Sequence, residues 1–157
     1  MSSFLEELRA ADEDLRHRTK PLVLDVPGRG GKYAIRYRPP EDRDVLTPVL
    51  ARISNGGALD ESEELQLIVD CCDEVLVREN PPRGEAVQPE GGPLRFDAGD
   101  ERWGDTKTAR GCVSWLFAAN QFPLSPARHV GSLIDWLQGL QAESAARLEG
   151  KSEAAGA

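Results

Sequence analysis

The sequence contains few residues that could support metal or disulfide chemistry: it has three cysteines and two histidines in 157 residues. Cys71, Cys72 and Cys112 form an odd set with two adjacent members, which fits neither a disulfide framework nor the spacing of a zinc site. All three fall at apolar positions of the pattern. We therefore predict buried thiols in a reducing cytoplasm, no metal site and no other cofactor.

Catalytic motifs are also lacking. There is no G-x-S-x-G, and neither His17 nor His129 has a serine or cysteine partner that the sequence identifies. Both histidines stand beside arginines in predicted helices, so we predict solvated surface positions for them. We expect a protein that is not an enzyme. The competing hypothesis, a small-molecule enzyme, would gain support if nucleotides or metals raised the melting temperature of the protein.

The chain has no long apolar run. None approaches the roughly 20 residues needed to span a bilayer. The N-terminal stretch MSSFLEELRAADEDLRHR carries acids and no apolar signal core. We expect a protein of the cytoplasm that makes no contact with a membrane.

An excess of positive charge is absent as well, because 27 acids outnumber 19 bases and give a net charge of −8. A chain this acidic repels phosphate backbones, which disfavours nucleic acid as a partner. Between Asp60 and Val77 there are acids and no base, and we interpret them as a solvated helix face in preference to a docking surface. The seven acids are Asp60, Glu61, Glu63, Glu64, Asp70, Asp73 and Glu74.

The glycine-rich segment PGRGGK, residues 27–32, could be a phosphate cradle or the turn of a hairpin. Alternating apolar residues flank it at Leu22 and Leu24 on one side and at Ile35 and Tyr37 on the other. This alternation is typical of two antiparallel strands. A phosphate loop would open into a helix, whereas these glycines lead into a strand. We predict a hairpin turn, with the hairpin's cations keeping a sheet edge soluble.

Four helices are predicted around this hairpin, and a fifth, at residues 4–18, is expected either as a short amphipathic helix or as a mobile arm. One helix follows Pro40 and ends at Asn55-Gly56-Gly57, with Pro48 either kinking it or restarting it after a Thr47 cap. The next begins with a capping box at Asp60 and Glu63. Its apolar positions are Leu65, Ile68, Val69, Cys72 and Val75 or Leu76.

In the back half of the chain, the apolar pattern predicts two more helices after a polar loop at residues 80–93. Short apolar pieces at 75–77 and 94–96 flank this loop and could pair. Asp105 or Thr106 is expected to cap one helix, and Ser125-Pro126 to begin the last. The expected buried stripes are Ala109, Cys112, Val113, Leu116 and Phe117 in the first, and Val130, Leu133, Ile134, Leu137 and Leu140 in the second.

These elements predict an α+β domain with a small antiparallel β-hairpin sheet on the N-terminal side, packed against about four helices. We divide the chain into an N-terminal helix or arm (1–18), the α+β domain (19–142) and a flexible C-terminal tail (143–157). The aromatic side chains of the back half are either core residues or half-exposed anchors for a partner. The candidate anchors are Trp103, Trp115, Phe117, Phe122 and Trp136.

The order of several segments resembles that of the tail assembly chaperones of long-tailed (siphovirus-type) bacteriophages or prophages. The resemblance covers roughly residues 21–140. It is carried by YAIRYRPPEDRD, the acidic helix, PLRFD, and DTKTARGCVSWLFAANQFPLSPARHVGSLIDWLQ. It implies a non-catalytic cytoplasmic protein that binds the tape-measure protein and tail-tube subunits and is absent from the mature virion. Association between copies stays open, and the alternative is an acidic DNA mimic or another small acidic adaptor.

The resemblance also implies a programmed frameshift near the end of the gene. Glu149-Gly150-Lys151 can be encoded as GAG-GGA-AAG, which contains the slippery heptamer G-GGA-AAG. A backward slip of one base would produce a longer form of the protein. We predict the slip site at these codons, past the last packed turn of the final helix.

Overall fold

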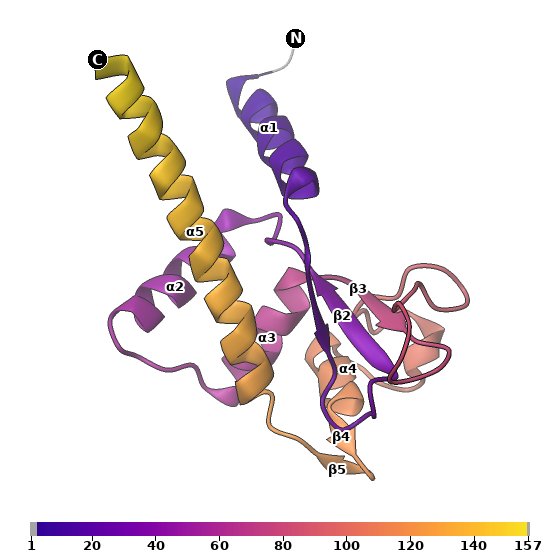
Figure 1. Cartoon of the computed structure of the whole chain (residues 1–157). Coiled ribbons are helices and arrows are strands. Elements are labelled where there is room, and N and C mark those ends of the chain that lie inside the picture. The colour runs from indigo at the N-terminus through magenta and orange to yellow at the C-terminus, as the bar shows by residue number, and fades with distance from the viewer. Residues whose placement is uncertain (1–2, 157) are drawn as a thin grey trace.

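The computed structural model describes residues 3–156, and within them the chain is an α+β protein, as predicted. The described residues form five α-helices, a three-stranded antiparallel sheet, and a two-stranded sheet that lies near the start of the last helix (Figure 1). The helices are α1 (Phe4–Arg18), α2 (Leu46–Ser54), α3 (Glu61–Cys71), α4 (Ala109–Leu116) and α5 (Ala127–Gly156). The strands are β1 (Leu22–Asp25), β2 (Tyr33–Tyr37), β3 (Cys72–Val77), β4 (Ala118–Ala119) and β5 (Phe122–Pro123).

The main sheet has the order β1-β2-β3, so β2 is its central strand. The register pairs Leu24 with Ile35 and Ile35 with Val75, which places these three side chains on one face. Ile35 and Tyr37 on that face are fully buried, as the alternation predicted, in a cluster that also contains residues of α2, α3, α4 and α5. Ala34, on the opposite face, is fully buried too, so burial along β2 does not follow the alternation throughout. The core is thus one apolar cluster between this face of the sheet and four helices.

The glycine-rich segment is a turn between β1 and β2, as predicted. Gly28, Gly30 and Gly31 have φ of 76°, 62° and 80°, values that glycine adopts without steric cost. Arg29, at the tip, donates hydrogen bonds to the carbonyl oxygens of Leu116 (3.0 Å) and Trp115 (2.8 Å). These carbonyls end α4, and a cation there is favourable. The turn therefore fastens the hairpin to the C-terminus of α4.

Helix α2 begins later than predicted and avoids the difficulty that Pro48 posed. A 3-10 turn, η1 (Arg43–Val45), precedes it, and α2 then starts at Leu46. Pro48 therefore lies in the first turn, where its missing N–H has no intrahelical partner to lose. The predicted Thr47 cap is wrong, because Val45 occupies the cap position without a side-chain hydrogen bond. The predicted stop is confirmed, since Asn55 is the C-cap.

Helix α3 has the predicted capping box of Asp60 and Glu63 but ends earlier than the sequence suggested. The chain changes from helix to strand between Cys71 and Cys72, so the predicted continuation of the helix to Val75 or Leu76 is wrong. Residues 72–77 form a strand because β3 pairs with β2 in the sheet. The expected pairing across the polar loop is partly present: the Val75 N–H donates to the Leu94 carbonyl (2.7 Å), although residues 94–96 form no strand.

The cap of α4 is Thr108, whose hydroxyl accepts from the Gly111 N–H (2.9 Å), and the predicted caps Asp105 and Thr106 are wrong.

Helix α5 begins at Ala127, one residue after the predicted start. Its packed face is the predicted one up to Leu137, with Leu140 half-buried. The helix continues to Gly156, whereas the sequence predicted a flexible tail from residue 143 onward. Residues 141–146 are all exposed, so this part of α5 extends beyond the core.

Candidate functional site

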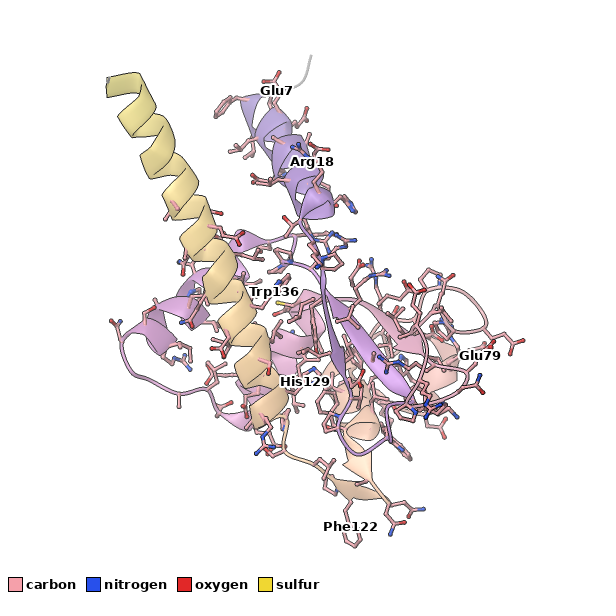
Figure 2. All side chains as sticks on the ribbon, viewed as in Figure 1. Glu7, Arg18, Glu79, Phe122, His129 and Trp136 are labelled. Carbon is pink, nitrogen blue, oxygen red and sulfur yellow. The ribbon has the colours of Figure 1, made fainter. Side chains whose placement is uncertain are left out.

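Two of the five predicted anchor residues are strongly exposed. The side chains of Trp115 and Phe122 are 70% and 72% accessible to solvent. Trp115 lies in the last turn of α4, and Phe122 belongs to the short β4–β5 hairpin that follows it. In Figure 2 the Phe122 ring points away from the body of the molecule. An exposed tryptophan and phenylalanine in one short stretch of chain are typical of a protein contact.

The other three predicted anchors pack against the protein itself. Phe117 is 1% exposed and its ring contacts the ring of His129, so it is a core residue and cannot reach a partner. Trp103 is half-buried, stacks on Phe96 with ring centroids 5.6 Å apart, and donates from Nε1 to the Arg95 carbonyl. Trp136 is half-buried against the core. The predicted set therefore does not form one continuous patch.

A second exposed apolar surface, which sequence reasoning did not select, lies on α1. This helix begins at a capping box between Ser3 and Glu6 and has no buried residue. Phe4, Leu8, Ala11 and Leu15 repeat at intervals of four and three residues, and we call them the α1 seam. Phe4 is 79% exposed, Leu8 38% and Leu15 49%, and the neighbouring Leu5 is 53% exposed. The helical periodicity of these residues is visible in the sequence, but the sequence does not show that no other part of the domain packs against them.

Arginine side chains attach α1 to the domain. Arg16 Nε donates to the Pro39 carbonyl (2.6 Å). Arg38 Nη1 donates to the carbonyl oxygens of Arg16, His17 and Thr19 at the C-terminal end of α1. Capping these carbonyls with a guanidinium satisfies groups that the helix leaves unpaired. The position of α1 therefore depends on directional polar contacts near its end.

Asp73 on β3 connects this attachment to the sheet. Its carboxylate accepts from Arg36 (2.8 Å) and from Arg38 (3.2 Å), and Arg36 also donates to Glu74 (2.7 Å). Asp73 is partly desolvated, but hydrogen bonds from the two arginines outweigh that cost and lower its pKa. The prediction that the hairpin's arginines merely keep a sheet edge soluble is wrong for Arg36 and Arg38. The acids Asp73 and Glu74 lie on a strand, not on the predicted helix face.

His129 is buried, which corrects the predicted surface position. The residue is 8% exposed, and its Nε2 lies 2.6 Å from the hydroxyl oxygen of Tyr37 on the central strand. Burial lowers the pKa of His129 to about 4, opposed by a hydrogen bond to the backbone of Asp25. The neutral imidazole that results can accept the Tyr37 O–H at Nε2. Figure 2 shows His129 on the first turns of α5, facing the sheet.

The three cysteines are buried free thiols, as predicted. Desolvation raises the pKa of the Cys72 thiol to about 12 and raises those of Cys71 and Cys112 as well. Thiolates are therefore scarce at neutral pH, which makes these side chains poor nucleophiles in the folded protein.

Among the residues whose side chains the structure describes, no group of three or more histidines, cysteines, aspartates or glutamates is arranged to hold a metal ion. No helix in the same part of the chain is long and apolar enough to cross a membrane. A search of protein-family models, of curated proteins and of solved structures finds no match to this chain.

Proposed function

We propose that the protein is a non-catalytic tail assembly chaperone of a long-tailed phage or prophage, which binds the tape-measure protein and tail-tube subunits in the host cytoplasm and is not retained in the virion. The choice of this family rests on the order of the sequence segments within residues 21–140, which resembles that of the tail assembly chaperones. The physical observation that supports binding is the exposure of Trp115 and Phe122 on an otherwise acidic protein.

Such a role makes a clear physical demand. A long helical chain with apolar stripes aggregates unless those stripes are covered while it awaits assembly. Exposed aromatic side chains can cover them reversibly. A net charge of −8 helps to keep the complex dispersed.

The alternative, an acidic mimic of DNA, fits the side chains less well. A phosphate mimic needs carboxylates that point outward along an extended face. Asp73 and Glu74, two of the seven clustered acids, instead accept hydrogen bonds from Arg36 and Arg38 and are largely buried. The remaining acids of this cluster lie on α3 and at its cap.

Co-expression with the tape-measure protein tests the proposal. The protein should raise the soluble fraction of the tape-measure protein, because it covers apolar surface on it. Replacing both Trp115 and Phe122 by serine should reduce that gain without unfolding the chaperone, since both side chains are exposed. Val87→Ser is a matched control, because Val87 is also exposed (47%) but lies in a different loop.

No gain in solubility together with no co-purification would contradict the proposal. A complex that dissociates steeply with added salt would favour the acidic mimic, whereas a contact made by apolar side chains should persist.

A further inference from the structure

We propose that the α1 seam is a docking site for an amphipathic helix whose own apolar seam is flanked by lysine or arginine. This inference is independent of the proposed function, because it is drawn from α1 and its surroundings alone. The partner is defined by its chemistry: apolar residues at intervals of three and four, with basic residues beside them.

The spacing of the α1 seam is that of a two-helix contact. Apolar residues at 4, 8, 11 and 15 alternate steps of four and three, which keeps them on one side of the helix and facing a partner helix. The helix is 15 residues long, about 22 Å at 1.5 Å per residue. No residue of α1 is buried, so the domain to which it is attached leaves this side uncovered.

The charges beside the seam select the partner. Glu7 and Asp14 lie along one side of it, and Asp12 lies on the other. Arg16 is directed to the Pro39 carbonyl, and Arg18, at the C-terminal end, is paired with Asp14 (2.8 Å). The flanks of the seam are therefore mainly acidic. Figure 2 shows Glu7 near the free end of α1 and Arg18 near its attached end.

These charges disfavour a second copy of α1 as the occupant. Two such helices, packed seam to seam in either direction, would bring the flanking acids of one against those of the other. A helix with basic flanks would replace this repulsion by attraction. Charge complementarity of this kind sets partner choice in helix pairs.

An open apolar hollow lies next to the attached end of α1. Pro39, which accepts the hydrogen bond from Arg16, lines this open hollow of about 420 Å³. Leu46 and Leu50 of α2 and Gln141 of α5 also line it.

A binding experiment with purified full-length protein tests this inference. The probe is a fluorescent synthetic helix of about 20 residues, long enough to cover the whole of α1, with leucine at the seam positions and lysine beside them. Two control peptides have glutamate in place of lysine or the same composition in scrambled order. Fluorescence anisotropy should show that the lysine peptide binds at least about tenfold more tightly than either control.

Variants locate the site. Replacing Leu8 and Leu15 by serine should weaken binding of the lysine peptide at least about tenfold, because two leucines no longer become buried. The exposed Phe122→Ser serves as the matched control and should leave binding unchanged. Glu7→Lys combined with Asp14→Lys should reverse the preference toward the glutamate peptide. Circular dichroism checks that each variant keeps its helix content and melting temperature.

Three outcomes would overturn the inference. The peptides could bind with equal affinity, or the serine variants could bind as tightly as the parent protein. Alternatively, sedimentation could show a dimer that the Leu8→Ser, Leu15→Ser protein no longer forms, which would make a second copy the occupant. The co-expression test described above involves a different surface, so the two proposals can fail separately.

Discussion

Acidification should destabilise this protein through a single buried histidine. His129 has a pKa of about 4 in the folded protein, against 6.5 for a solvated histidine. Because folding lowers the pKa, the unfolded chain takes up a proton at a higher pH than the folded protein does. The contribution of His129 to stability is therefore fully present above pH 6.5 and is lost as the pH falls toward 4.

The size of this effect follows from the two pKa values. The full difference corresponds to about 3 kcal/mol, and between pH 7 and pH 5 the loss should be about 2 kcal/mol. This is a large part of the total stability of a domain of this size. Burial of the ring beside Tyr37 is the physical cause, because the charged imidazolium would lose its hydration there.

Urea unfolding at pH 7, 6 and 5 measures this effect when the parent protein is compared with His129→Gln. Glutamine can still accept a hydrogen bond from Tyr37 but does not titrate, so the variant should lose about 2 kcal/mol less than the parent between pH 7 and pH 5. The carboxylates common to both proteins cancel in this comparison. Parallel profiles for the parent and His129→Gln would refute the reasoning.

Four further predictions follow from other parts of the fold. Arg29→Ala should cost about 1–3 kcal/mol in urea unfolding, because two carbonyls at the end of α4 lose a charged donor, while Arg83→Ala in the exposed polar loop should cost almost nothing. Asp73→Asn should cost about 2–3 kcal/mol, since it leaves two arginines without their shared carboxylate, and a change below about 0.5 kcal/mol would contradict the role given to the cluster. Cys72 and the other thiols should react with a disulfide reagent at pH 8 only after urea unfolds the chain; rapid labelling of the folded protein would show that they are accessible. At codons 149–151 the gene should contain a heptamer that survives a one-base backward shift, and expression of the intact gene should give a second, larger product; a shifted frame that stops within a few codons excludes slippage there.

The fold could be predicted where local periodicity decides the structure. The β1–β2 hairpin and the packed stripe of α5 follow from apolar residues repeating at two or at 3.6 residues. The boundary between α3 and β3 could not be found in this way. The apolar residues from Ile68 to Leu76 keep a helical rhythm through Cys72, and only pairing with β2, more than 30 residues earlier in the chain, makes the last of them a strand.

The candidate surfaces were only partly predictable for a similar reason. The sequence named Trp115 and Phe122 but could not separate them from Phe117, since all three are aromatic residues of one short stretch and only packing distinguishes them. It also placed His129 at the surface because Arg128 precedes it. The side chain that buries it, Tyr37, is 92 residues away. Exposure is a property of the tertiary structure, and a single sequence does not record it.

The way α1 is attached has a consequence for how this protein can change over time. Two arginines hold its C-terminal end through hydrogen bonds, and the helix contributes no residue to the core. Mutations along its apolar side therefore escape the constraint that close packing places on interior residues. Successive generations could replace this side one residue at a time, following a changing partner, while the sheet and the other helices keep their sequence. The docking side proposed for α1 and the folded core are thus made of different residues and can evolve separately.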